Sequence, residues 1–247
     1  MRKKMPHRLY VEYPLLKDDL VELSPEQSHY LANVMRAQPG DAVGLFNGHD
    51  GEWAAEVAQI KKKCVGLRVI CQSKQQHSEP TLMLAFAPIK KARIDFVAQK
   101  ATELGVSHLQ PILTHRTNVE RVKTDRMQAN AVEAAEQCER LTVPTVSEPI
   151  KLGELLAYWP KDRMIMFCDE DLSGLTAHTA LSQLPEEQKA SPWAIIIGPE
   201  GGFDDTERAA IKANTNTIVV SLGPRVLRAD TAAIAAISLW QSAVGDW

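Results

Sequence analysis

The chain has 247 residues, of which 45% are hydrophobic and 24% charged, with a formal net charge of -3. This composition is typical of a globular protein and excludes a uniformly basic protein that coats nucleic acid. No apolar run reaches the ~20 residues that a membrane-spanning helix needs, and the first ten residues lack the apolar stretch of a secretory signal, so we expect a cytoplasmic protein. The four cysteines form no Cys-x-x-Cys pair, and no histidine stands at zinc spacing. We therefore expect no metal site and reduced, mostly buried thiols.

The charge is distributed unevenly along the chain. Residues 81–126 carry a net charge of +4, residues 127–247 carry -8, and residues 1–80 carry +1. This pattern is compatible with an RNA-binding surface in the basic part of the chain, and equally with an ordinary solvated face.

Residues 8–72 show the pattern of a small β-barrel. Short extended segments are separated by turn signals at Pro39-Gly40 and Asn47-Gly48. One helix is predicted among them, because Ser24 is a good N-cap, Pro25 follows at the first helical position, and apolar residues continue at helical spacing to Arg36. The strands are predicted at residues 9–13, 42–47, 52–60 and 64–72.

Residues 73–80 (SKQQHSEP) are polar, end in proline and form the predicted linker between two domains. Beyond them, strands and helices alternate, which favours an α/β domain with a largely parallel sheet covered on both faces. Ligands of such sheets bind at the carboxyl ends of the strands. The last helix is apolar almost all round and should be buried, either within its own domain or against a second subunit. Strands are predicted at residues 82–87, 109–112, 164–168, 193–197 and 218–221, and helices at 94–104, 124–140, 205–214 and 231–244.

Two loops that follow apolar strands are rich in glycine and proline. Residues 198–203 (GPEGGF) leave bare backbone that a ligand can approach closely, and Asp204 or Asp205 caps the next helix. A ligand-free turn would need only one glycine. The second loop, residues 221–231 (SLGPRVLRADT), contains Arg225 and Arg228, which suit a phosphate or a polarised carbonyl, or alternatively pair with nearby aspartates. A third strand end, residues 167–174 (FCDEDLSG), adds carboxylates, although an ordinary acidic turn explains it equally well.

These motifs resemble those of a known enzyme family. The two glycine loops look like the paired cofactor motifs of the RsmE family, the 16S ribosomal RNA (uracil-N3) methyltransferases of the SPOUT superfamily. The similarity spans nearly the whole chain. Two residues depart from the family pattern, because Glu139 stands where glycine is usual and Asp230 where glutamate is commoner. The other matching segments are residues 100–106 (KATELGV), 136–140 (EQCER), and the barrel with residues 29–36 and 39–41.

The resemblance implies the fold, the cofactor and the partners. It implies a trefoil-knotted SPOUT methyltransferase domain at residues 81–247, behind a PUA-like β-barrel RNA-binding domain at residues 1–72 and the linker at 73–80. It also implies S-adenosyl-L-methionine as the cofactor, 16S ribosomal RNA within the small subunit as the substrate, and a homodimer.

The resemblance also implies a set of site residues. Uracil N3 becomes a good nucleophile only when its proton leaves, so a base or a group that stabilises the anion is needed. Arg228 is the first choice for contacting the anionic uracil or its phosphate, and Glu200 is the weaker choice for the base. The cofactor-binding residues expected are Cys168, Asp169, Ile197, Gly198, Pro199, Glu200, Gly201, Gly202, Ser221, Leu222, Gly223, Val226, Leu227, Arg228 and Thr231.

The RNA-binding residues are predicted from their place in the basic part of the chain or near the sheet edge. Two alternatives stay open at this point: a SPOUT methyltransferase that acts on another RNA, and a non-catalytic RNA-binding assembly factor. The candidates for RNA contact are Arg8, Arg36, Lys90, Lys91, Arg93, Arg116 and Arg140.

Overall fold

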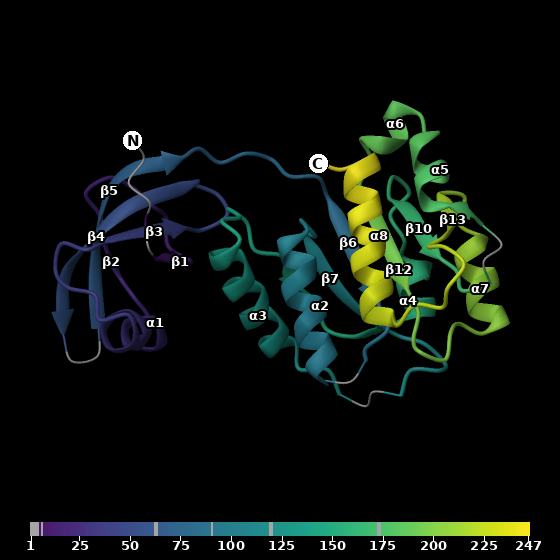
Figure 1. Ribbon diagram of the computed structural model, residues 1–247, viewed down its shortest axis with the longest axis horizontal. Helices are drawn as coiled ribbons and strands as arrows, with labels where there is room; N and C mark the ends of the chain where they lie inside the picture. Colours follow the sequence, from purple (N-terminus) through teal and green to yellow (C-terminus); the bar gives the residue numbers. More distant parts are fainter. Residues whose placement is uncertain (1–4, 6, 62–63, 90, 119–120, 172–173) are drawn as a thin grey trace. The chain divides into compact units, whose positions relative to one another are not determined.

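The computed structural model describes residues 5, 7–61, 64–89, 91–118, 121–171 and 174–247, without the side chains of residues 91 and 92 (Figure 1). The chain forms two compact units. Unit 1 comprises residues 1–78 and 135–143, and unit 2 comprises residues 79–134 and 144–247.

This division differs from the sequence-based one in two respects. Strand β5 continues to Lys74, so the first two residues of the expected linker belong to the sheet of unit 1. Residues 135–143, expected in the second domain, belong to unit 1 because Arg8 donates hydrogen bonds to the carbonyl oxygens of Ala135 and Arg140, at 2.8 and 2.9 Å. Phe46 also packs with Ala135 and Leu141 in a small buried cluster.

Unit 1 is built on a five-stranded sheet with the order β1-β3-β4-β5-β2. The pair β1–β3 is parallel, whereas β3–β4, β4–β5 and β2–β5 are antiparallel. The long β4–β5 hairpin contains register shifts, which increase the bend and twist of the sheet. The strands are β1 (Arg8–Tyr10), β2 (Leu20–Glu22), β3 (Ala42–Phe46), β4 (Glu52–Lys61) and β5 (Cys64–Lys74).

The predicted helix of unit 1 begins where its capping signals indicated. Helix α1 (Pro25–His29) starts with a capping box in which the Ser24 hydroxyl accepts from the Gln27 amide at 3.2 Å. The helix then changes to a π-helix, η1 (Tyr30–Val34), whose turn is wider than that of the predicted α-helix. The apolar side of this segment packs into the unit 1 core through the fully buried Leu31.

Unit 2 contains an eight-stranded sheet in which every described pair of strands is parallel. The order is β11-β13-β10-β12-β6-β7-β8, and β9 pairs with β7. All five residues of β12 are buried, which explains its unbroken apolar run. The strands are β6 (Leu82–Phe86), β7 (His108–Leu113), β8 (Thr145–Val146), β9 (Ile150–Lys151), β10 (Met164–Cys168), β11 (Leu175–Thr176), β12 (Trp193–Ile197) and β13 (Thr217–Ser221).

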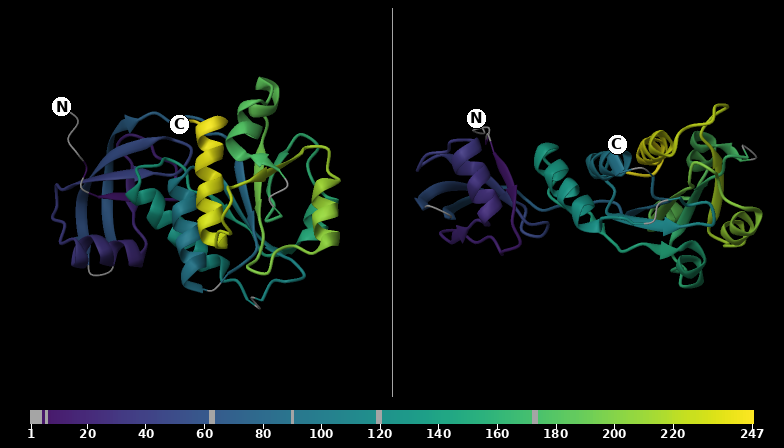
Figure 2. Two further views of the ribbon diagram at one scale, coloured as in Figure 1. Left: turned by 45° about the vertical axis from the view of Figure 1, so that its right-hand side comes forward. Right: turned by 90° about the horizontal axis from the view of Figure 1, so that it is seen from below.

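Helices cover both faces of this sheet, as the alternating pattern predicted (Figure 2). One face packs against α2, α5 and α8, and the other against α4 and α7. On the first face the indole rings of Trp193 and Trp240 lie 6.3 Å apart, and Trp240 of α8 is almost fully buried. The helices are α2 (Lys91–Glu103), α3 (Thr124–Gln137), α4 (Leu152–Ala157), α5 (Ala177–Ser182), α6 (Glu186–Lys189), α7 (Asp205–Lys212) and α8 (Ala229–Ala243).

Two further observations concern the described part of the chain. None of its helices combines the length and the apolar character needed to cross a bilayer. The expectation that the cysteines are mostly buried is wrong, because Cys71 and Cys138 are exposed. Cys71 lies near the end of β5 and Cys138 directly after α3, where the chain faces solvent.

Candidate functional site

The carboxyl ends of three neighbouring strands meet at one edge of the unit 2 sheet. Strand β10 lies between β12 and β13, and both pairs are parallel. The two glycine loops and the acidic turn follow these three strands directly. The sheet therefore brings together three segments that are up to about 60 residues apart in sequence.

These segments surround a cavity of about 460 Å³. Its volume lies within the range of small-molecule sites, roughly 300–1,000 Å³. Thirteen of the fifteen expected cofactor-binding residues line it, and Ser221 and Thr231 do not. Four further lining residues, Glu170, Arg225, Ala229 and Ala232, were not among those expected to bind the cofactor. The lining residues are Cys168, Asp169, Glu170, Ile197, Gly198, Pro199, Glu200, Gly201, Gly202, Leu222, Gly223, Arg225, Val226, Leu227, Arg228, Ala229 and Ala232.

The first glycine loop forms a turn closed by a hydrogen bond from the Gly202 amide to the Pro199 carbonyl, at 2.9 Å. Gly202 has a φ of +70°, and a β-carbon there would collide with the carboxylate of Glu170. A β-carbon on Gly198 would lie 2.7 Å from the ring of Phe203. Gly202 therefore requires glycine for its backbone conformation, and Gly198 requires it for close packing against Phe203.

Helix α7 begins directly after this loop. Asp204 is its N-cap and accepts a hydrogen bond from the Glu207 amide at 2.8 Å. The Glu207 carboxylate accepts in return from the Asp204 amide at 3.0 Å, which completes a capping box. Of the two aspartates predicted to cap this helix, the structure thus selects Asp204.

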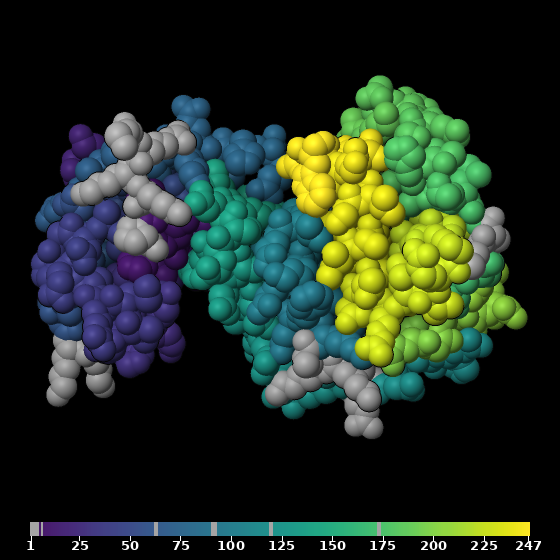
Figure 3. Space-filling view, viewed as in Figure 1, coloured from purple at the N-terminus to yellow at the C-terminus, as the bar shows by residue number. Residues whose placement is uncertain are grey.

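The second glycine loop leads into α8 and is exposed on one face of unit 2 (Figure 3). Gly223 has a φ of +109°, and its amide donates to the Ser221 hydroxyl at 3.2 Å. This local bond explains why Ser221 turns towards the loop backbone instead of lining the cavity. Val226 is 91% exposed, which places an apolar side chain at the open side of the cavity.

The acidic turn after β10 is held by two cations of α7, a feature that the sequence interpretation did not predict. The Asp169 side chain is fully buried and pairs with Arg208 at 2.9 Å and Lys212 at 2.7 Å. Arg208 also pairs with Glu170. Hydrogen bonding to Asp169 raises the pKa of Lys212 above its ordinary value. The sequence did contain a signal for this arrangement. Arg208 and Lys212 are four residues apart, so a helix places both side chains on one face.

Cys168 ends β10 and lines the cavity. Burial raises the pKa of its thiol well above the ordinary value, so the thiol is neutral and unreactive as a nucleophile. Cys168 therefore contributes a small, polarisable side chain to the wall of the cavity.

The two catalytic candidates both line the cavity but differ in their surroundings. The Glu200 carboxylate accepts from Arg93 at 2.7 Å, and its side chain is 56% exposed. Arg228 is the N-cap residue of α8 and is exposed. Within the described part of the chain, no carboxylate lies within ion-pair distance of the Arg228 guanidinium.

The structure contradicts one of the RNA-binding predictions. The Arg8 side chain is only 7% exposed, and its Nε donates to the buried Glu52 carboxylate at 2.6 Å. The guanidinium also lies 4.4 Å from the centre of the Phe46 ring. Arg8 holds unit 1 together, so we withdraw it from the RNA-binding set.

The other RNA-binding candidates lie in different settings. Arg36 is exposed, with a φ of +56°. Arg116 donates to the Gly201 carbonyl at 2.8 Å, and Arg140 donates to the Thr142 hydroxyl at 2.9 Å. Arg93 and Arg116 therefore approach the first glycine loop. Lys90 and the Lys91 side chain lie outside the described residues.

Among the residues that the structure describes, no cluster of three or more histidine, cysteine, aspartate or glutamate residues is suited to a metal ion.

Comparison with known proteins agrees with this architecture. Residues 76–241 match the model of an RNA methyltransferase domain, and residues 23–69 match that of an RNA methyltransferase PUA domain. Ribosomal RNA small subunit methyltransferase E of Rickettsia conorii is 32% identical, over 94% of this chain and 93% of that protein.

Two solved structures are similar over nearly their whole length. A methyltransferase from Legionella pneumophila, solved with the cofactor SAM, has a TM-score of 0.86 and 32% identity, covering 97% of this chain and 98% of that one. Ribosomal RNA small subunit methyltransferase E from Neisseria gonorrhoeae, bound to S-adenosyl methionine, has a TM-score of 0.86 and 27% identity, covering 98% and 99%. With an RNA methyltransferase domain, a PUA domain and these relatives, the chain belongs to the ribosomal RNA small subunit methyltransferase E family.

Proposed function

We propose that this protein transfers a methyl group from S-adenosylmethionine to N3 of a uridine in 16S ribosomal RNA of the small subunit. The observation that carries the proposal is the cavity of about 460 Å³ at the carboxyl ends of β10, β12 and β13, lined by both glycine loops. The names of the relatives support the small-subunit RNA, and the two similar structures with bound S-adenosylmethionine support the cofactor.

The residues of the cavity fit this cofactor. Backbone groups of residues 197–202, Leu222 and Leu227 are available to contact a nucleoside, because the glycines remove side chains that would block it. When bound, S-adenosylmethionine supplies a methyl group on a positively charged sulfur. Apolar wall residues such as Ile197 and Leu222 exclude water from the same space. The lining residues assigned to the cofactor by sequence keep that role in the proposal. Ser221 and Thr231, which do not line the cavity, stay sequence-based predictions.

The chain must also handle the proton on uracil N3. In the proposal, the Arg228 guanidinium lies beside the base and stabilises the negative charge that develops on O2 and O4 as the proton leaves. Glu200 is the candidate that accepts the proton, although one of its oxygens already accepts from Arg93. Holding donor and acceptor near contact distance supplies most of the remaining rate enhancement.

RNA binding is proposed to use cations on both units. Arg36 and Arg140 of unit 1 and Arg116 of unit 2 stay in this set, and Lys90 and Lys91 stay as sequence-based predictions. Because each phosphate contact releases counterions, RNA affinity should fall as salt is added. A flat salt response would exclude RNA as the substrate.

We also propose a homodimer. Partly exposed apolar residues of α8, including Ile234 and Leu239, are available for a second subunit. Sedimentation should give a mass of twice 27.4 kDa, whereas a monomer at micromolar concentration would contradict the proposal.

The central test is mass mapping of methylated nucleosides in ribosomal RNA from cells that lack this protein. We expect the loss of one N3-methyluridine from 16S RNA, restored by the wild-type chain. Arg228→Ala and Glu200→Ala should bind S-adenosylmethionine in calorimetry but transfer methyl slowly. If both variants turned over normally, the assignment of these residues would be wrong. Loss of a methyl group from transfer RNA instead would identify a different RNA target, and absence of cofactor binding would indicate a non-catalytic RNA-binding factor.

A further inference from the structure

Arg93 connects the two glycine loops through two ion pairs. It is the third residue of α2, and its Nη1 lies 2.7 Å from Glu200 Oε1 in the first loop. Its Nε lies 3.8 Å from Oδ2 of Asp230, where the end of the second loop forms the first turn of α8. The Arg93 side chain is 30% exposed and that of Asp230 is 18% exposed, so the pair is partly screened from water.

The position of Arg93 differs from that of an RNA contact. A side chain that contacts phosphate needs donors that face solvent, but two nitrogens of this guanidinium already face carboxylates within its own unit. The two carboxylates belong to segments about 30 residues apart, and α2 belongs to neither segment. One cation therefore fixes the distance between two loops that carry like charges.

We propose that Arg93 is a positioning residue that holds the two glycine loops at a fixed distance from each other around the cavity. It acts on the cofactor through Glu200 and Asp230 and does not itself contact the reacting atoms. The inference rests on the proposed function, since the ligand of the cavity is taken to be S-adenosylmethionine. It replaces the assignment of Arg93 to RNA.

The geometry requires arginine at this position. Nε and Nη1 lie on different parts of the planar guanidinium and reach two acceptors at once, whereas a lysine ammonium is a single point charge. Arg93→Lys should keep the charge but hold only one loop, and should therefore recover part of the function that Arg93→Ala loses.

Arg126 offers a matched control. It is an arginine of α3 whose guanidinium pairs with Asp95 of α2 at 2.5 Å, and its side chain is 50% exposed. Arg126→Ala removes the same charge and a similar ion pair, which like that of Arg93 involves a residue of α2, but Arg126 pairs with neither glycine loop. Its effect measures what loss of a surface ion pair does by itself.

The test is calorimetry of the full chain with S-adenosylmethionine in the absence of RNA. We expect Arg93→Ala to raise the dissociation constant about three- to tenfold, the size of one partly screened ion-pair network. Arg93→Lys should give a smaller increase, and Arg126→Ala should match the wild type. The effects of Arg93→Ala and Glu200→Gln should not multiply in the double variant, because both remove the same contact. Thermal unfolding of each variant checks that the fold is kept.

A second readout separates positioning from RNA contact. RNA affinity is measured against salt concentration for the wild type and Arg93→Ala. A positioning residue leaves the salt slope unchanged, whereas loss of a phosphate contact lowers it by about one. An unchanged cofactor affinity with a lower salt slope would overturn the inference and restore the RNA role. If the wild type bound no S-adenosylmethionine, the proposed function would fail and the inference with it. Normal wild-type binding with an unaffected Arg93→Ala variant would overturn the inference alone.

Discussion

At Gly202 we expect one added methyl group to damage the cavity by two separable effects, backbone strain and a side-chain collision. Its φ of +70° costs an L-residue about 1–2 kcal/mol. A β-carbon would also collide with the Glu170 carboxylate, which can move away only by weakening its pair with Arg208. Since Glu170 is 40% exposed, that pair contributes roughly 0.2–1 kcal/mol. The expected loss of unfolding free energy for Gly202→Ala is therefore roughly 1–3 kcal/mol.

Two neighbouring glycines separate these causes. Gly223 has a φ of +109° but nothing within 4 Å of an added β-carbon, so Gly223→Ala should show the backbone cost alone. Gly201 does not have a positive φ, and its β-carbon would meet Arg116 at an ordinary 3.4 Å. Gly201→Ala should therefore stay within about 0.5 kcal/mol of the wild type.

The assay is urea unfolding of the three variants, followed by calorimetry with S-adenosylmethionine. The collision is isolated by comparing Gly202→Ala in the wild type and in a Glu170→Ala background, where its cost should shrink by roughly 0.2–1 kcal/mol. Equal losses for Gly201→Ala and Gly202→Ala would refute the reasoning, because the two differ in backbone conformation and in the carboxylate contact. An unshifted unfolding midpoint for Gly202→Ala would refute it as well.

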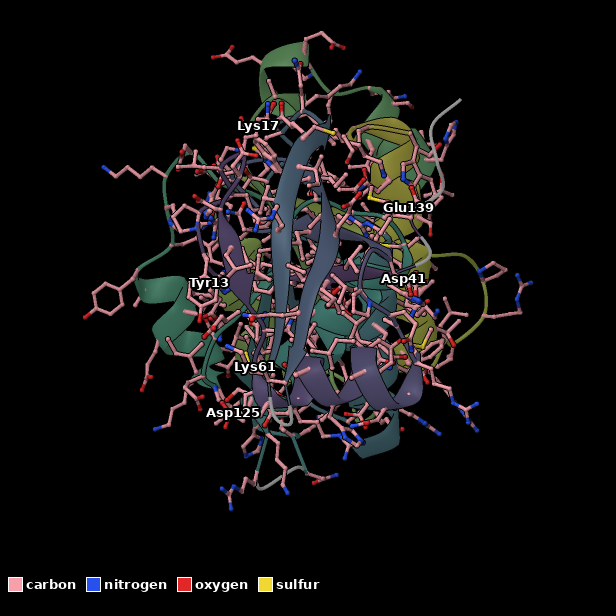
Figure 4. The ribbon with its side chains drawn as sticks, turned by 90° about the vertical axis from the view of Figure 1, so that its left-hand side faces the viewer. Tyr13, Lys17, Asp41, Lys61, Asp125 and Glu139 are labelled. Atoms are coloured by element: carbon pink, nitrogen blue, oxygen red, sulfur yellow. The ribbon has the colours of Figure 1, made fainter. Side chains whose placement is uncertain are left out.

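Three further predictions follow from local features of the fold. Glu139, labelled in Figure 4, has a φ of +63° just after α3. Glycine adopts this conformation without strain, so urea unfolding should show Glu139→Gly to be more stable than Glu139→Ala by roughly 1 kcal/mol. Equal stability of the two variants would show that the backbone is not strained there. Arg208→Ala leaves Lys212 as the remaining cation paired with the buried Asp169 carboxylate and should cost about 1–3 kcal/mol of unfolding free energy. No measurable cost would show that Lys212 suffices. Burial lowers the pKa of His108 below its ordinary 6.5, so the unfolded state binds the proton more readily than the folded state, and the stability present above pH 6.5 is lost as the pH falls through the lowered pKa. In His108→Gln the unfolding free energy should therefore depend less on pH between pH 7.5 and 5.5. The same pH dependence as in the wild type would refute the role of His108.

The departure of Glu139 from the family pattern has a structural explanation. The position is left-handed, which is why glycine is usual there, and in this chain the Glu139 carboxylate pairs with Lys74 at 2.8 Å. Its side chain is 59% exposed, so the ion pair offsets little of the backbone cost. The sequence identified the unusual residue, but only the backbone angle explains its cost.

Local patterns in the sequence were sufficient for the main elements of the fold. The apolar runs of β10 and β12 were predicted with the bounds observed, because a strand buried on both faces has no polar alternation. The glycine loops were predicted to share a sheet edge, since parallel strands place their carboxyl ends together. Short elements such as α4, β8 and β9 were missed, because two to six residues carry too little periodicity. The knot stays a prediction.

Tertiary structure decided which partner each charged side chain takes. Arg8, Arg93 and Arg116 all lie in basic stretches and were grouped as RNA contacts for that reason. Their actual partners, such as Glu52 for Arg8 and Glu200 for Arg93, stand 44 and 107 residues away. An ion pair depends on distances between side chains, and these distances are set only when the strands and helices pack. The sequence could therefore indicate which loops offer their backbone to a ligand. It could not indicate which arginines and lysines are free of partners within the protein and so able to contact RNA.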